Sequence, residues 1–180
     1  MNEPNILCII DMQNDFISGA LGTLQADAAT ENAVKEITRK KWDRIIFTRD
    51  THESNYLSTQ EGKMLPVPHC IFKSDGWVID NRIQRAIDQA TKNGTLVTKA
   101  INKISFGTFE WKDRIDRKEC EGIEIIGLCT DICVITNALI LKTMYPETPI
   151  YVKEDCCAGV TNETHKAAID VMKSCQVIVI

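Results

Sequence analysis

The stretch that decides the fold is IEIIGLCTDICVITNALILKTM at residues 123–144, where a buried strand passes directly into a helix. Residues 123–128 are a short apolar run rich in β-branched side chains, as expected for a strand covered on both faces. From Thr130 to Met144 the apolar residues recur three and four positions apart, which predicts a helix. Strands that alternate with helices favour right-handed crossovers and a parallel sheet.

The same alternation continues along the rest of the chain. The remaining predicted strands, which bring the total to six, lie at 6–10, 44–48, 95–98, 149–152 and 176–180. Helices are predicted at 28–40, 78–92 and 162–174, with a shorter one near 110–117. Because no repeat or linker divides the chain, we expect one domain over residues 1–180. It should be a three-layer α/β/α fold with a six-stranded parallel sheet, which binds ligands beyond the carboxyl ends of its strands.

Composition narrows the class of function. The 180 residues are 44% apolar, which is enough to fill the core of one domain. With 21 Lys and Arg against 25 Asp and Glu, the net charge of -4 offers no basic surface for nucleic acid. No apolar run reaches the roughly 18 residues of a membrane span, and the start, MNEPNILCIID, lacks the features of an export signal. We expect a cytoplasmic protein that binds neither nucleic acid nor membrane.

One of the eight cysteines is a candidate nucleophile. Without an export signal the cysteines should be reduced, and the C-x3-C pair Cys129 and Cys133 is a poor match to a structural zinc site. Cys133 falls in the first turn of a predicted helix, where free backbone N–H groups and the helix dipole would lower the thiol pKa. The alternative is an inert cysteine, since cysteines in buried helices usually act as small apolar residues.

A carboxylate and a lysine are expected near the same edge of the sheet. Asp11 directly follows the first strand and could act as a general base if desolvated, although Asp at such a position also often caps a turn. Lys99 and Lys103 follow the third strand, where an ammonium group could stabilise negative charge beside a thiolate. Spacing alone does not choose between these lysines.

The long loop 50–77 contains a candidate metal site. Asp50, His52, Glu61 and His69 provide two carboxylates and two imidazoles, a donor set suited to zinc, iron or manganese. The alternative is a pair of solvated histidines with acidic neighbours by chance. The third histidine, His165, is expected to be exposed and without a role.

Five motifs resemble the isochorismatase-like cysteine hydrolases, and within them the nicotinamidases (pyrazinamidases), over nearly the whole chain. They are DMQNDF at 11–16, DTH at 50–52, PHC at 68–70, KISFGTF at 103–109 and GLCTDICV at 127–134. The resemblance implies a triad with Cys133 as nucleophile, Asp11 as base and Lys103 as cationic partner, although a longer insertion in some members would point to Lys99. It also implies a cis peptide bond before Cys129, and an oxyanion hole formed by the N–H groups of Cys129 and Cys133.

The resemblance further implies that Asp50, His52, Glu61 and His69 bind a divalent metal, zinc in first place and otherwise iron or manganese, which receives the pyridine nitrogen of the substrate. One departure concerns substrate binding. An aromatic residue often stands three positions before the last histidine of the loop, and here that position is Pro66. Three other aromatic residues then become candidates for the substrate-binding wall: Phe16, Phe106 and Trp77.

The expected function is therefore hydrolysis of nicotinamide to nicotinate and ammonia through a cysteine thioester, an amidohydrolase reaction of NAD salvage. The first alternative keeps the triad but acts on another small amide or a carbamoyl compound. Hydrolysis of the vinyl ether of isochorismate is less favoured, because that branch does not need the metal-binding set. A non-enzymatic binding module would lack a triad member, whereas all three are present here. The sequence leaves a homo-oligomer open.

Overall fold

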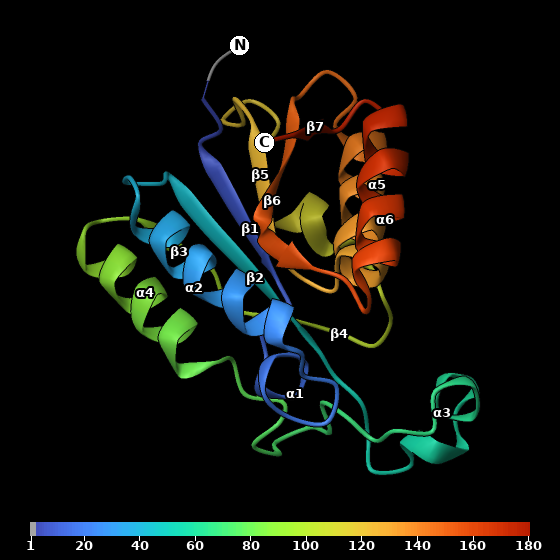
Figure 1. Cartoon of the computed structure of the whole chain (residues 1–180). Coiled ribbons are helices and arrows are strands. Elements are labelled where there is room, and N and C mark those ends of the chain that lie inside the picture. Colours follow the sequence, from blue (N-terminus) through green and yellow to red (C-terminus); the bar gives the residue numbers. More distant parts are fainter. Residues whose placement is uncertain (1–2) are drawn as a thin grey trace.

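The structure, a computed structural model, describes residues 3–180 and is built on a parallel sheet of seven strands (Figure 1). The order across the sheet is β3-β2-β1-β5-β6-β7, and β4 pairs with the end of β2. All paired strands run parallel. The strands are β1 Ile6–Ile10, β2 Arg44–Asp50, β3 Leu96–Val97, β4 Ile101–Lys103, β5 Ile123–Leu128, β6 Ile150–Ala158 and β7 Ile178–Val179.

Helices cover both faces of the sheet. The α-helices are α1 Asn14–Ile17, α2 Leu24–Thr38, α3 Gln60–Met64, α4 Asn81–Lys92, α5 Ile135–Met144 and α6 Asn162–Ser174. Figure 1 shows α2 and α4 on one face and α5 and α6 on the other, which confirms the three-layer α/β/α prediction. Short 3-10 segments span Tyr56–Ser58 and Glu110–Asp113. None of the helices formed by residues 3–180 is long and apolar enough to cross a bilayer.

The alternating side chains of β1 explain why this strand is apolar throughout. Leu7 and Ile9 join the core cluster that includes residues of α2 and α4. Ile6, Cys8 and Ile10 join the second cluster, which includes residues of α5 and α6. Because successive side chains of a strand point to opposite faces, a strand between two helical layers must be apolar at every position.

The prediction of six strands was wrong by one. β4 lies between the predicted strand at 95–98 and the short predicted helix near 110–117, and its three residues, INK, are too few to show a periodic pattern. β6 continues to Ala158, well beyond the predicted end at residue 152. Its middle residues, Lys153 to Asp155, are charged and largely exposed, so the hydropathy pattern ends before the strand does.

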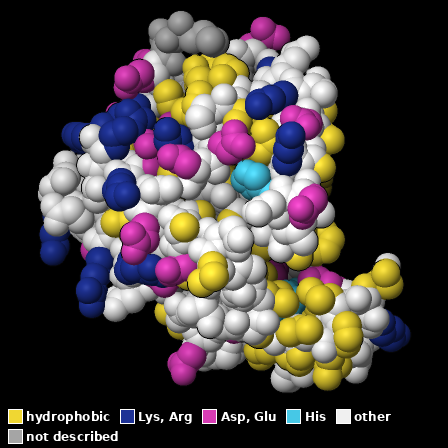
Figure 2. Space-filling view, in the orientation of Figure 1, with side chains coloured by type: hydrophobic (Ala, Val, Ile, Leu, Met, Phe, Trp, Pro, Cys, Tyr) yellow, Lys and Arg dark blue, Asp and Glu magenta, His cyan; other side chains and the backbone are white. Residues whose placement is uncertain are grey.

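The carboxyl ends of β1, β2, β4, β5 and β6 meet at one edge of the sheet, and close packing there depends on a glycine. Gly127 has φ +131°, and a Cβ on it would lie 2.0 Å from the Ile10 carbonyl oxygen. Only glycine therefore allows β1 and β5 to approach this closely before their candidate functional residues. Beyond this edge, α3 projects from the body of the protein (Figure 1), and hydrophobic side chains gather on this projection (Figure 2). They include Leu57, Met64 and Leu65.

Candidate active site

Three sequence-predicted residues meet around one ammonium group. Lys103, at the end of β4, places Nζ 2.6 Å from Asp11 Oδ2 and 3.4 Å from Cys133 Sγ. Its third neighbour is Asp50, whose Oδ1 lies 3.2 Å away. All four side chains are buried. Thus β1, β2, β4 and the turn after β5 each contribute one member of a compact charged group.

Asp11 is held by its backbone as well as its side chain. It has φ 46°, a left-handed conformation that Asp tolerates better than most residues. The Thr48 hydroxyl donates a hydrogen bond to Asp11 Oδ1 (2.6 Å), and the Asp11 N–H donates to Thr48 Oγ1 (3.2 Å). Burial raises the pKa of Asp11, and the charge of Lys103 opposes this shift. A raised pKa gives the carboxylate a greater affinity for a proton, as a general base requires.

Cys133 lies in the π-helical turn Thr130–Val134, which we call the nucleophile turn. The expectation that the helix start would lower the thiol pKa was wrong. Burial raises the pKa of Cys133 well above its usual value, and Lys103 offsets only part of this effect. Burial would lower the pKa of Lys103, but the carboxylates of Asp11 and Asp50 hold it well above the ordinary lysine value. The resting pair is therefore a neutral thiol beside a charged ammonium group, and activation of the thiol requires a base.

The backbone before the nucleophile turn has the predicted conformation. The peptide bond between Leu128 and Cys129 is cis. The carbonyl of Cys129 accepts hydrogen bonds from the N–H groups of Ile132 (3.1 Å) and Val134 (3.0 Å). Both Cys129 and Cys133 line the cavity described below. Their role as an oxyanion hole stays a prediction.

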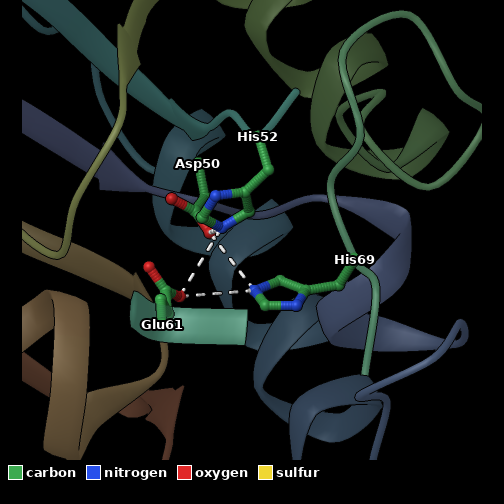
Figure 3. Close-up of side chains that lie close together, drawn as sticks. All are labelled: Asp50, His52, Glu61 and His69. Carbon is green, nitrogen blue, oxygen red and sulfur yellow. Dashed lines mark hydrogen bonds and ion pairs between the residues drawn. The ribbon is translucent and has the colours of Figure 1, made fainter. Parts of the chain in front are cut away.

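The four candidate metal ligands come together (Figure 3), and one of them, Asp50, also contacts Lys103 of the triad. One ligand atom from each of Asp50, His52, Glu61 and His69 lies within 4.8 Å of the others. Asp50 Oδ2 is 2.9 Å from His52 Nε2 and 3.5 Å from His69 Nε2. Glu61 Oε1 is 3.6 Å and 3.9 Å from the same two nitrogens. Ligand atoms at about 2.1 Å from one ion lie at most roughly 4.2 Å apart, so small side-chain shifts would suffice to bind a divalent metal.

The protonation pattern of this group also suits a metal. Although burial would raise the pKa of Asp50, hydrogen bonds with His52 and His69 and the charge of Lys103 hold it well below the usual range. The Nδ1–H of His69 donates to the Val67 carbonyl (2.8 Å), so that a metal ion replacing the proton on Nε2 would find this nitrogen facing the other ligands. A buried group with two carboxylates and two imidazoles matches borderline divalent cations such as zinc.

Cys133 of the triad and three of the four candidate metal ligands line one mostly apolar cavity of about 220 Å³. Phe16 and Phe106, two predicted aromatic wall residues, line it together with Asp50, Glu61, His69 and Cys133. Trp77 does not line it, so this prediction was wrong. The Trp77 indole donates to Thr51 Oγ1 (2.9 Å), and the Arg49 guanidinium lies over its ring at 3.7 Å.

Several supporting residues were missed from sequence. The buried side chain of Gln13 accepts from the Asp50 N–H (2.7 Å) and donates to the Asp50 carbonyl (2.9 Å), which ties the end of β1 to β2. Asp15 accepts from the Cys70 N–H (2.8 Å) next to His69. Both residues belong to the 11–16 motif. The concentration of polar residues directly after a strand could have indicated from sequence that they support the site. His165, expected to be exposed, is half-buried, and its Nδ1 lies 2.8 Å from Thr130 Oγ1.

Comparison with known proteins agrees with this geometry. The Isochorismatase domain family matches residues 5–180. The nicotinamidase of Saccharomyces cerevisiae is 26% identical over 175 residues, covering 74% of this chain and 79% of that protein. The structure of nicotinamidase/pyrazinamidase from Bacillus subtilis has a TM-score of 0.83 at 23% identity and covers 97% of both chains. That of pyrazinamidase from Pyrococcus horikoshii in complex with zinc has a TM-score of 0.75 at 23% identity, again covering 97% of both chains. Since the family match spans nearly the whole chain, this protein belongs to the isochorismatase family.

Proposed function

We propose that this protein is a nicotinamidase, an amidohydrolase that converts nicotinamide to nicotinate and ammonia. The observation that carries the proposal is the shared cavity, which Asp50, Glu61 and His69 line together with Cys133. Such a cavity suits a small aromatic amide whose ring binds at the metal ligands while its carboxamide reaches the sulfur. The similarity to nicotinamidases of yeast and bacteria supports the same substrate.

The chemistry follows from the positions of the triad. Asp11 accepts the proton of the Cys133 thiol, and the thiolate attacks the carboxamide carbon. Lys103 stabilises the charge between them, since its Nζ contacts both Asp11 Oδ2 and Cys133 Sγ. The N–H groups of Cys129 and Cys133 would stabilise the oxyanion, which becomes the thioester carbonyl as ammonia leaves with the proton from Asp11. Water activated by Asp11 then hydrolyses the thioester, releasing nicotinate and the Cys133 thiol.

The metal-binding group contributes substrate positioning. Asp50, His52, Glu61 and His69 would hold a divalent ion, with zinc as our first choice and iron or manganese as alternatives. A bound ion would supply a Lewis-acidic site for the lone pair of the pyridine nitrogen. Fixing the ring at that end while Phe16 and Phe106 contact its faces would hold the amide near the sulfur, which converts an encounter into a positioned reaction.

The test compares ammonia release from nicotinamide, pyrazinamide and benzamide by the metal-loaded protein. Nicotinamide and pyrazinamide both offer a ring nitrogen at the required place and should be hydrolysed. Benzamide has the same shape but no nitrogen, so its kcat/KM should be about 10- to 100-fold lower. Comparable rates on benzamide and nicotinamide, or no activity on nicotinamide, would refute the proposed substrate.

One feature favours a second candidate, another small amide or a carbamoyl compound on the same triad. Leu65, not an aromatic residue, lines the cavity next to Pro66, so this wall is less selective for a flat ring. The amide panel above decides between these substrates. All eight cysteines are free, so we also propose that the protein works in a reducing compartment such as the cytoplasm.

A further inference from the structure

His165, which the proposed mechanism does not use, contacts the nucleophile turn. Its Nδ1 lies 2.8 Å from the hydroxyl of Thr130, the first residue of this turn, and Thr130 is fully buried. On the other side of the ring, Glu154 Oε1 lies 3.7 Å from Nε2. The carboxylate favours a proton on Nε2, so that Nδ1 is left to accept from the Thr130 hydroxyl.

The fold brings His165 to this position through a glycine. A Cβ on Gly159 would lie 2.8 Å from both the Cβ and the backbone nitrogen of His165, so α6 can begin this close to the end of β6 only if residue 159 is glycine. The neighbouring Asp131 carboxylate accepts from the Val160 N–H at 3.1 and 3.3 Å. The nucleophile turn is thus joined at two points to the segment 158–165, and residues 158–160 of that segment also line the active-site cavity.

We propose that His165 is a positioning residue, which orients the nucleophile turn through the Thr130 hydroxyl and so aligns Cys133 with Asp11 and Lys103. The inference rests on the proposed hydrolase function of Cys133, but its contacts do not involve the substrate or the metal ligands. Without this hydrogen bond, the buried hydroxyl of Thr130 would lose its contact with His165. The same turn must hold the sulfur of Cys133 at hydrogen-bond distance from Lys103. Small displacements of a nucleophile are costly, because the reaction depends on alignment.

The test uses a pair of substitutions at one position. His165→Leu removes the polar atom with little change in size, whereas His165→Asn keeps a polar atom bonded to Cγ, where Nδ1 stands. Thr130→Val removes the partner hydroxyl at nearly constant shape, and it provides the same test if His165→Leu does not fold. Lys166→Ala, at an exposed neighbouring position on α6, is the control.

Two measurements are made on each variant: kcat and KM for nicotinamide, and the rate at which iodoacetamide alkylates Cys133, followed by mass spectrometry of its peptide. His165→Leu and Thr130→Val should each lower kcat and the alkylation rate about 3- to 10-fold, the change that matches the net free energy of one hydrogen bond. KM should change less than about twofold, since substrate contacts are unaltered. His165→Asn should recover most of the loss, and the double variant should lose no more than either single one.

The proposal is overturned if His165→Leu reacts at the wild-type rate, if His165→Asn is as impaired as His165→Leu, or if the two losses multiply in the double variant. Failure of the proposed function looks different. The wild-type protein would then release no ammonia from nicotinamide, while the alkylation rates of Cys133 would still show whether His165 aligns the thiol.

Discussion

The buried carboxyl pair between β5 and α2 predicts an unusual dependence of stability on pH. Glu124 is fully buried on β5, and Glu36 of α2 lies beside it at 6% exposure. Burial, and after it the charge of Glu36, raises the pKa of Glu124 from 4.5 to about 7. Arg39 lies closer to Glu36 (2.5 Å) than to Glu124 (3.7 Å), so it neutralises the pair incompletely. The folded protein therefore keeps a proton on Glu124 that the unfolded chain releases.

The sign of the effect follows from this difference. Below pH 4.5 Glu124 is protonated in both the folded and the unfolded chain, so its ionisation does not destabilise the fold. Between pH 4.5 and about 7 the unfolded chain loses its proton first, so the free energy of unfolding falls as pH rises. Above pH 7 Glu124 is ionised in both states, and the free energy of unfolding is lower by roughly 3 kcal/mol than at low pH. This value is the pKa difference of Glu124 multiplied by about 1.4 kcal/mol for each unit.

Glu124→Gln removes this cost, because a neutral amide needs no proton and can donate to the Glu36 carboxylate. In urea unfolding, the variant should gain about 1 kcal/mol over wild type at pH 5 and about 3 kcal/mol at pH 8.5. Glu147→Gln, which removes an exposed carboxylate, is the control. A gain that is equal at both pH values, or larger at pH 5, would refute the assignment of the proton to Glu124.

Three further predictions concern the active site. Cys133→Ala should abolish ammonia release, to below about 0.1% of wild type, while circular dichroism and the unfolding midpoint change little, so residual turnover above that level would exclude a thioester. Lys103→Ala should lower kcat/KM at least 100-fold and Lys99→Ala less than about threefold, because only Lys103 contacts Asp11 and Cys133; equal losses would contradict this geometry. Elemental analysis should find one divalent ion per chain, and Glu61→Gln should weaken its retention against a chelator about 10- to 100-fold, whereas unchanged retention would exclude Glu61 as a ligand.

Sequence patterns identified the elements whose burial is uniform. β1 is apolar throughout, and β5 is apolar apart from Glu124 and Gly127, because helices cover both of their faces, and such runs are visible without knowledge of the fold. β4 was missed because its three residues are ordered by pairing with β2, a contact that local sequence does not encode. The charged, exposed middle of β6 concealed its length for a similar reason.

The candidate site also contains residues that sequence could identify and residues that only the structure reveals. The residues with distinctive chemistry, such as Cys133 and His69, stood out by type and spacing, and the structure brings them together. Residues that act through geometry did not stand out: Thr48 and Gln13 are ordinary polar residues until the neighbouring strand supplies their partners. Trp77 illustrates the opposite error, because a large aromatic residue in a functional loop can serve the packing of that loop alone.

The position of Asp50 couples the triad and the metal-binding group electrostatically. One of its oxygens faces the Lys103 ammonium group, and the other faces the imidazoles of His52 and His69. A carboxylate divides a single negative charge between both oxygens, so a cation bound on the imidazole side draws charge away from the lysine side. Chelation should therefore act as a remote substitution in the triad, lowering kcat as well as raising KM for nicotinamide. A rise in KM with unchanged kcat would show that the two halves work independently. A lower kcat together with a higher KM would show that Asp50 couples the metal-binding group to the triad.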